Sequence, residues 1–474
     1  MNEVKSNSKL TYVQMAAFGS GHLVNNLFPG ALGVFSFFLL TTFGIDPFLA
    51  GLLGGIPRIY DAITDPIMGY ISDNTTSRWG RRRPYIFIGA ITSGILFACL
   101  WQMDASNSQT YNFWYFMLFS LLFLTGNTIY STPLIGLGYE MTSDYNERTK
   151  LMGFSQTISQ LAWMIVPWLW VMIANPDLYA NQGVAIRSLA IWVGAACLFL
   201  GIMPAIFCQE VNQDALTNKD TITLKNIVRN MKGLWNNMKL IFKNVPFVRL
   251  CMATFLVFNG FQMVASFSFF IIVYYLFNGS FENAGNWPAW FSTIGAMATA
   301  FLIIPIITWM SHKWGKRKAF IISTAISVIG YILKWWGFNP ENIWLMFIPI
   351  PFLSFGLGGL FTLMMSMTAD VCDLDELKNG MPRKEGTFGA IYWWMVKLGQ
   401  GLALVLGGLV LKVIGFEGGA AIQTAETLTN LRLADIFIPS ITAIIAIVVM
   451  WNYDLDEEKA HAIKTELVQR RGEL

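Results

Sequence analysis

The stretch R-I-Y-D-A-I-T-D-P-I-M-G-Y-I-S-D-N-T-T-S-R-W-G-R-R-R, residues 58–83, places charges inside an apolar segment and a basic loop directly after it. Its first part belongs to a run long enough to cross a bilayer, which takes about 20 mostly apolar residues. Arg58, Asp61 and Asp65 are spaced so that they share one face of a helix. An ionisable group at the membrane centre costs about 2.5–3.5 kcal/mol, and it is retained when it is paired or lines a cavity. The stretch therefore predicts a membrane protein with a functional charge cluster in one span.

The composition of the whole chain predicts the same class. It is 54% hydrophobic, 15% aromatic and only 13% charged, whereas the surface of a soluble protein needs more charge. A net charge of +3 gives no reason to expect a nucleic-acid partner. The five cysteines form no CxxC pair, and His22, His312 and His461 are scattered. We therefore expect no disulfide framework, no metal cluster and no cofactor. The polar N-terminus lacks the pattern of a cleaved signal.

Hydropathy predicts an all-α membrane protein with twelve transmembrane helices. The segments lie near 14–43, 48–71, 85–104, 113–138, 152–173, 188–208, 248–277, 288–311, 319–337, 342–368, 386–414 and 434–452. Of the 32 Lys and Arg residues, 26 fall in the two termini, the central loop and the loops after even-numbered spans. Arg187, Lys334, Lys412 and Arg432 are assigned near the opposite membrane face. Because basic loops stay in the cytoplasm, both termini are predicted to be cytoplasmic.

The chain also contains signs of a duplication. The loop S-R-W-G-R-R-R at 77–83 returns as H-K-W-G-K-R-K at 312–318, and acidic loops at 140–149 and 369–376 also correspond. Basic loops could resemble one another for topology alone, but Trp and Gly in register favour duplication. Two parallel six-helix halves are the architecture of the major facilitator superfamily. We expect a half at 1–209, a central cytoplasmic loop at 210–246 with an amphipathic helix, a half at 247–452 and a tail at 453–474.

The charged face of the second span predicts a cation site. Asp61 and Thr128, on spans two and four, lie at matching depths, and Thr64 adds a hydroxyl beside Asp61. Carboxylate and hydroxyl oxygens form a hard site that suits Na⁺, and a proton on one carboxylate would replace the ion. The alternative is a salt bridge between Arg58 and one aspartate that only pins the helix. One aspartate is enough for that bridge, so Asp65 is left as the charge that needs a cation.

A further charge is placed inside span eleven, at Lys397. It lies far from either end of its segment, so we expect it to reach the span-two aspartates or the substrate. The alternative is a lysine whose ammonium reaches the membrane surface.

The run at 58–85 resembles the glycoside–pentoside–hexuronide:cation symporter family. The likeness extends to E-M-T-S-D-Y-N-E-R-T at 140–149 and to R-K-E-G-T-F…M-V-K at 383–397. The resemblance implies a secondary active symporter of the bacterial inner membrane that moves a sugar or glycoside with Na⁺ or H⁺ by alternating access. It also implies Na⁺ at Asp61 and Asp65 with help from Thr128, and Arg58 and Lys397 as charge partners.

The sugar side of the resemblance departs from the family pattern. Two positions where the family has acidic sugar contacts are Asn25 and Ser131 here, and a family arginine falls at Gln156. Amide and hydroxyl groups can still bind sugar hydroxyls. The candidate substrate residues are Asn25, Asn26, Ser131, Gln156, Trp393 and Trp394. The alternative for each is helix packing or anchoring at the membrane interface.

Charged residues near the cytoplasmic ends of the even spans form a candidate gate. Ion pairs there could close the inner side and break during turnover, although positive-inside topology with solvated counter-charges would give the same residues. They are Asp73, Arg78, Arg82, Glu140, Asp144, Arg148, Asp370, Asp373, Arg383 and Glu385.

Two other functions remain open at this point. A cation-coupled carrier of another cargo, such as a lysolipid, would keep the same span-two aspartates. A sugar sensor or a membrane enzyme is disfavoured, because the chain has no GxSxG or HExxH signature and only a short tail.

Overall fold

The computed structural model describes residues 10–142, 145–210, 222–379, 385–418, 420–455 and 457–471, and these residues form helices and loops without strands. The chain divides into two compact units. One contains Met1–Asp46 and Ile59–Met231, and the other contains Pro47–Arg58 and Lys232–Leu474. The first turns of the second helix therefore belong to the second unit, which the sequence did not predict.

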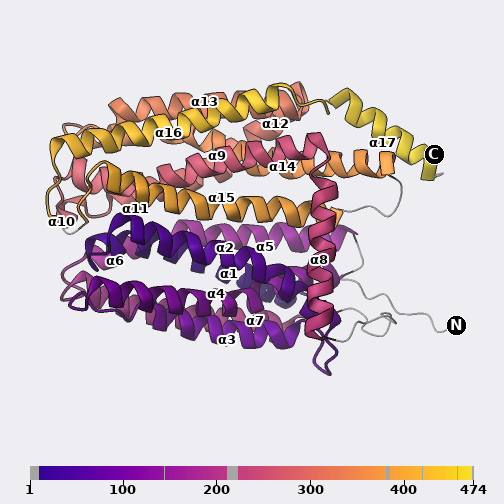
Figure 1. The fold of residues 1–474 in the computed structure, drawn as a ribbon, viewed down its shortest axis with the longest axis horizontal. Coiled ribbons are helices and arrows are strands. Elements are labelled where there is room, and N and C mark those ends of the chain that lie inside the picture. Colours follow the sequence, from indigo (N-terminus) through magenta and orange to yellow (C-terminus); the bar gives the residue numbers. More distant parts are fainter. Residues whose placement is uncertain are drawn as a thin grey trace. The chain divides into compact units, whose positions relative to one another are not determined.

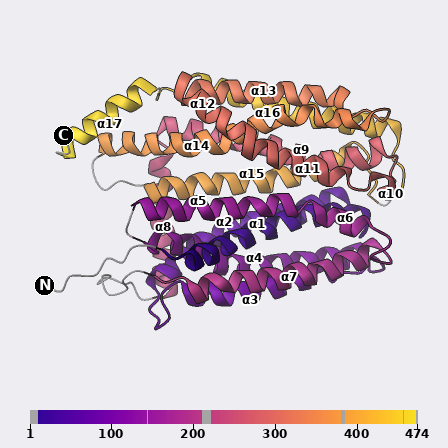
Figure 2. The same ribbon diagram turned by 180° about the vertical axis from the view of Figure 1, so that it is seen from behind.

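The helices of the first unit run alongside one another (Figures 1 and 2). In chain order they are α1 (Tyr12–Thr41), α2 (Pro47–Asn74), α3 (Arg83–Leu100), α4 (Gln109–Glu140), α5 (Tyr145–Ile165), α6 (Trp168–Ala174) and α7 (Gln182–Phe207). Polar caps set several of their starts. Thr11 forms a capping box with Gln14, and Ser108 and Asn181 accept backbone N–H bonds at the starts of α4 and α7.

The second unit repeats this all-helical construction. Its elements are α9 (Val245–Phe270), η1 (Ile271–Leu276), α10 (Phe281–Ala284), α11 (Trp287–Met297), η2 (Ala298–Ile303), α12 (Ile304–Trp314), α13 (Lys316–Gly337), η3 (Ile343–Phe347), α14 (Pro349–Asn379), α15 (Glu385–Val413), α16 (Ala425–Trp451) and α17 (Glu457–Arg471). Here η1 and η2 are π-helical and η3 is a 3₁₀ helix. The tail helix α17 packs on α14 and buries Ile463 and Leu467.

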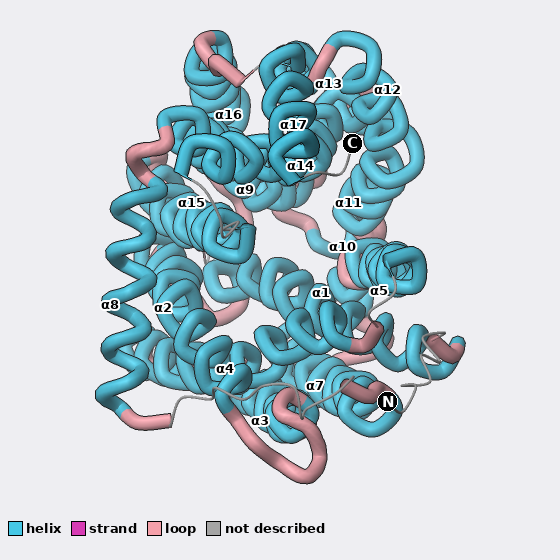
Figure 3. Tube along the Cα trace, turned by 90° about the vertical axis from the view of Figure 1, so that its right-hand side faces the viewer, coloured by secondary structure: helices cyan, strands magenta, loops and turns pink. Residues whose placement is uncertain are grey.

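The predicted amphipathic helix is present as α8 (Leu224–Ile241). Its first residues belong to the first unit. It is seen from the side in Figure 3. Leu224 and Val228 are exposed on α8.

Eleven helical stretches among the described residues are long and apolar enough to cross a membrane. The chain is therefore a multi-pass membrane protein, as its composition predicts. α2 is as long as the others but is not among the eleven, because Arg58, Asp61 and Asp65 make it more polar. The predicted total of twelve spans requires α2 to cross as well, and it stays a prediction together with the cytoplasmic termini.

Aromatic rings fill the core of the first unit. Phe28 packs against Phe97 and Phe123 with ring centroids 5.1 Å apart in both pairs, which joins α1, α3 and α4. Glycine also allows the backbones of α3 and α4 to approach each other closely. A Cβ on Gly89 of α3 would lie 2.5 Å from the Tyr130 nitrogen of α4, so only glycine fits there. This close packing fixes the position of α4.

The two basic loops have related geometry in their own units. Gly80 and Gly315 both adopt positive φ, 102° and 81°, which suits glycine alone. Arg83 donates to backbone carbonyls at the end of α7, and Arg317 donates to the last carbonyl of α16. α7 and α16 correspond to the sixth and twelfth predicted spans. The two loops therefore also resemble each other in the helix ends that their arginines contact.

An acidic residue follows the last span of each half and approaches the same loop. The Glu210 carboxylate accepts backbone N–H bonds from residues 81–83 at 2.9–3.3 Å. In the second unit, a Cβ on Gly315 would lie 2.8 Å from Glu457 Oε2. Plain positive-inside topology does not require this match, so the geometry favours duplication.

Candidate functional site

The predicted cation-site residues meet between α2 and α4, within the first unit. The Thr128 hydroxyl lies 2.9 Å from Asp61 Oδ1 and 3.2 Å from Asp65 Oδ1. Asp61 and Thr128 are buried, with 3% and 2% of their surfaces exposed, and Asp65 is partly buried. Thr64 lies 3.3 Å from the Thr128 hydroxyl. Two carboxylates and two hydroxyls therefore converge on one place in a span.

Two more threonine hydroxyls of α4 lie near the predicted site residues. The Thr132 hydroxyl lies 3.4 Å from Asp65 Oδ1, and the Thr125 hydroxyl lies 2.8 Å from the Tyr60 hydroxyl. Thr125, Thr128 and Thr132 are spaced to share one helix face. Sequence reasoning found Thr128 by its depth and missed the other two, although the spacing is visible in the sequence.

Arg58 and Lys397 are the predicted charge partners of this site. Arg58 is partly buried, one turn before Asp61, and Lys397 is partly buried on α15. The start of α2 and α15 pack closely within the second unit. A Cβ on Gly55 would lie 2.6 Å from the Gly401 carbonyl oxygen, and one on Gly51 would lie 2.7 Å from the Leu404 oxygen. Both basic residues therefore lie on helices that glycines bring together, and their role in coupling stays a prediction.

The predicted substrate residues fall into two groups. Asn25, Asn26, Ser131 and Gln156 belong to the first unit, and Trp393 and Trp394 belong to the second. Among them Asn26 already has a structural role. Its amide donates to the Ser159 hydroxyl at 2.5 Å and to the His22 carbonyl, and its oxygen accepts from the Trp163 indole.

The other candidates differ in exposure. Ser131 is buried, Asn25 is partly buried and Gln156 is exposed. Trp393 is 45% exposed and stacks on Phe361 with centroids 6.2 Å apart. Trp393 therefore leaves part of its aromatic ring exposed on α15, where a sugar ring could contact it. The substrate role of all six residues stays a prediction.

Three of the predicted gate residues, Asp73, Arg82 and Asp370, form ion pairs that can be described, each within its own unit. Arg82 donates to Asp73 at 2.7 Å in the first unit, and Lys316 pairs with Asp370 at 2.6 Å in the second. Burial is the main cause that lowers the pKa of Arg82, and the nearby Asp73 carboxylate opposes it. Asp373 is partly buried. Asp144 and Arg383 lie outside the described residues, as do the side chains of Glu140, Arg148 and Glu385.

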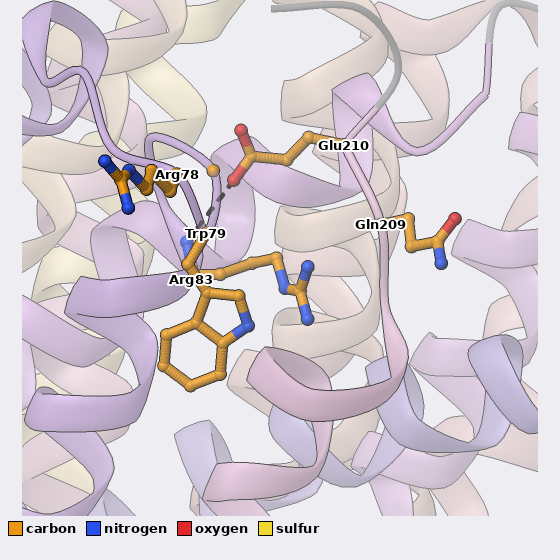
Figure 4. A pocket seen from close by; sticks show the side chains of 6 residues that line it. Arg78, Trp79, Arg83, Gln209 and Glu210 are labelled. Carbon is orange, nitrogen blue, oxygen red and sulfur yellow. Dashed lines mark hydrogen bonds between the residues drawn. The ribbon is translucent and has the colours of Figure 1, made fainter.

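Arg78 is exposed and lines a cavity of about 230 Å³ beside the basic loop (Figure 4). The other lining residues are Trp79, Gly80, Arg83, Gln209 and Glu210. The Arg83 guanidinium lies 5.4 Å from the Trp79 ring, and Arg78 lies apart from both in Figure 4. A latch between the two halves stays a prediction, since the pairs that can be described stabilise the loops of each unit separately.

A buried ion pair in the second unit was missed by sequence reasoning. Lys334 on α13 pairs with Asp435 on α16, and their side chains are 0% and 1% exposed. The Lys334 ammonium also donates to the Ser268 hydroxyl of α9 at 3.1 Å. Lys334 lies in the last turn of α13, at the end predicted to be near the opposite membrane face, but its ammonium turns inward to Asp435. Asp435 was overlooked because the last span was predicted to begin at 434, whereas α16 begins at Ala425 after the Thr424 cap.

Comparison with known proteins decides the family. A family model described as MFS/sugar transport protein matches residues 17–457. The chain belongs to this family. The match covers both units and the central loop, so the predicted resemblance to cation-coupled sugar symporters of the major facilitator superfamily is confirmed.

Relatives and solved structures agree with this assignment. The chain is 23% identical to a glucuronide carrier protein homolog of Escherichia coli, over 98% of this chain and 97% of the relative. It is also 23% identical to the sodium-dependent lysophosphatidylcholine symporter 1 of Mus musculus, over 99% and 91%. A bacterial homolog of the lysosomal transporter Spinster has the same fold, with a TM-score of 0.67, 14% identity and coverage of 94% and 97%. The family is therefore one of carriers rather than enzymes.

Proposed function

We propose that the chain is a secondary active symporter that moves a sugar or glycoside into the cell together with Na⁺ or H⁺. The observation that carries the proposal is the convergence of the Asp61 and Asp65 carboxylates on the Thr128 hydroxyl. Charges placed this deep are expensive unless they bind something. The family assignment supports the carrier function. The similarity to a glucuronide carrier protein homolog supports the sugar cargo.

The chemistry of the site explains how a cation could be coupled to a cargo. Two carboxylates that both contact the Thr128 hydroxyl would repel each other if both were charged, and a bound monovalent cation or proton would relieve that repulsion. Oxygen ligands alone suit Na⁺. If the bound cation favours the state that binds sugar, the sugar must in turn favour cation binding by the same factor. Substrate accumulation then follows the cation gradient.

The test is uptake of labelled sugars into membrane vesicles with and without a Na⁺ or proton gradient. Asp65→Cys should abolish accumulation against a gradient while exchange of sugar across the membrane continues. Asp177→Cys, in an exposed loop, is the matched control and should behave as wild type. Accumulation that survives in Asp65→Cys, with normal protein levels in the membrane, would reject the proposed site.

A lysolipid is the second candidate cargo, because a sodium-dependent lysophosphatidylcholine symporter matches almost the full length of the chain. The replacement of acidic sugar contacts by Asn25 and Ser131 is compatible with either cargo. A competition assay of uptake distinguishes the sugar cargo from the lysolipid cargo. Uptake inhibited by a panel of glycosides, pentosides and hexuronides supports the sugar symporter, and uptake inhibited by lysophospholipid alone supports the lipid carrier.

A further inference from the structure

The exposed residues of α5 divide into a polar face and an apolar face. Gln156, Gln160 and Trp163 are spaced so that they share one helix face, and each is at least partly exposed. Leu161 and Ile165 are exposed on another face of the helix. Lipid can surround an apolar face, but it leaves amide groups without hydrogen-bond partners. The apolar face is therefore the one suited to lipid, and the polar face is suited to water.

Trp163 lies on the polar face at a depth that does not suit an anchor at the membrane surface. The candidate span runs over Lys150–Ala174, and Trp163 lies near its middle. Tryptophans that anchor a helix are enriched at the two membrane–water interfaces instead. Trp163 is nevertheless 43% exposed, and a Cβ at Gly153, earlier on the same face, would meet no atom within 4 Å. An exposed indole therefore lies deep in the span, on its polar face.

Asn26 of α1 holds the indole of Trp163. Its side-chain oxygen accepts the indole N–H at 3.2 Å. Its amide nitrogen donates to the His22 carbonyl at 3.1 Å and to the Ser159 hydroxyl at 2.5 Å. An indole N–H can only donate and a carbonyl can only accept, so these partners fix the orientation of the amide. Both amide hydrogens of Asn26 are engaged in this arrangement.

We propose that Trp163 is a substrate-binding residue whose indole stacks on a pyranose ring, and that Asn26 is the positioning residue that orients it. This inference rests on the proposed function of the chain as a sugar symporter. The C–H groups on one face of a pyranose suit an aromatic ring, and the hydroxyls around its edge suit amides. Gln156 and Gln160 supply two amides on the same face of α5. The polar face of α5 therefore combines a ring for stacking with donors and acceptors for hydroxyls.

The first test asks whether the polar face of α5 is in contact with water. Membrane vesicles that contain the full-length protein are treated with a water-soluble maleimide, and wild type with its five native cysteines gives the background. Gln160→Cys should be labelled, because a thiol reacts as its thiolate, which forms in water rather than in lipid. Leu161→Cys, the next residue but on the apolar face, is the matched control and should be labelled much more slowly. Equal labelling of the two variants would overturn the proposal.

The second test measures uptake of radiolabelled methyl pyranosides (glucoside, galactoside, xyloside and glucuronide), with the one that wild type takes up fastest as the probe. Trp163→Leu should raise its half-saturation concentration roughly threefold to tenfold, the size of one aromatic contact, at a maximal rate close to wild type. Trp163→Phe keeps a ring and should show a smaller increase. Trp192→Leu removes an exposed tryptophan of α7 and should behave as wild type.

A double variant tests the positioning role of Asn26. Asn26→Ala should also raise the half-saturation concentration of the probe. In the Trp163→Leu background it should add nothing further, because its effect passes through the indole. Additive effects of the two substitutions would show that Asn26 binds the sugar directly, and would overturn its role as a positioning residue.

The outcomes separate this inference from the proposed function. An unchanged half-saturation concentration in Trp163→Leu overturns the stacking role alone, since the sugar is still transported. Uptake of lysophospholipid but of none of the pyranosides by wild type overturns the sugar symporter and this inference with it. Should Trp163→Leu fail to reach the membrane, uptake by Trp163→Phe and the labelling of Gln160→Cys decide the question.

Discussion

The buried Lys334–Asp435 pair allows a strong test of how charge is tolerated inside this protein. Both side chains are almost fully enclosed, at 0% and 1% exposure. Removing one partner of such a pair leaves an uncompensated buried charge, which destabilises by about 3–5 kcal/mol. Replacing both partners with apolar residues of similar volume is often neutral or stabilising. We therefore expect Lys334→Met and Asp435→Val to be harmful singly and well tolerated together.

The expected effect is large enough to measure in detergent. At about 2–4 °C per kcal/mol for a unit of this size, each single variant should melt roughly 6–20 °C below wild type. The double variant should recover most of that loss. Thermal unfolding of a protein like this is often irreversible, so all variants must be heated at one rate and compared as apparent melting temperatures. Lys225→Met, at an exposed position of α8, controls for the loss of a lysine.

Two results would refute the reasoning. Single variants that melt within a few degrees of wild type would show that the pair is hydrated or can be neutralised without cost. A double variant as unstable as the single variants would show that the loss comes from packing or from the Ser268 contact, rather than from an unpaired charge.

Three further predictions concern other parts of the fold. Glu210→Ala removes the acceptor of three backbone N–H bonds and should cost about 1–2 kcal/mol, as loss of a helix cap does, with Glu210→Gln milder in the same melting assay. Gly55→Ala should impair folding or transport, because its Cβ would lie 2.4 Å from a Val405 methyl group, whereas Gly33→Ala, with open space around it, should not. Asp104 has a lowered pKa, first because of its hydrogen bonds with Ser106 and then because of Arg187. Its contribution to stability is therefore present above the ordinary Asp pKa and is lost as the pH falls through the lowered value. Asp104→Asn should remove that acid-range change in melting temperature, and an unaltered pH profile would contradict the assignment.

The membrane class and most span positions could be predicted because they depend on local composition. Apolar runs of sufficient length have few alternatives to a spanning helix. Two span ends differ by about ten residues: the tenth span was predicted to end at 368 but α14 ends at Asn379, and the last was predicted to begin at 434 but α16 begins at Ala425. Glu426 and Arg432 lower the hydropathy of its first turns, whereas the Thr424 cap starts the helix. Hydropathy measures burial in lipid and does not register a polar cap.

The meeting of the α2 aspartates with Thr128 could be predicted, because depth along two helices that run in the same direction is readable from the sequence. Asp61 and Thr128 were matched in this way. The Thr132 contact with Asp65 was missed because it depends on the rotation of α4 about its axis, which is set by contacts such as Gly89 against Tyr130. The pairing of Lys334 with Asp435 was missed for the same reason, since it depends on which faces of α13 and α16 meet.

The carboxylates on the helices of the two units differ in the groups that are described beside them. The counter-ion of Asp435 is the ammonium of Lys334, which is covalently tethered and enclosed. Such a pair is neutral without a bound ion and therefore does not need a mobile cation. Asp61 and Asp65 instead lie beside the hydroxyls of Thr128 and Thr132. A hydroxyl stabilises a carboxylate without neutralising it, and it can also offer an oxygen to a cation. The two sets of side chains therefore suit different tasks. A tethered pair suits helix packing, and two carboxylates flanked by hydroxyls suit an ion that must bind and leave in every cycle.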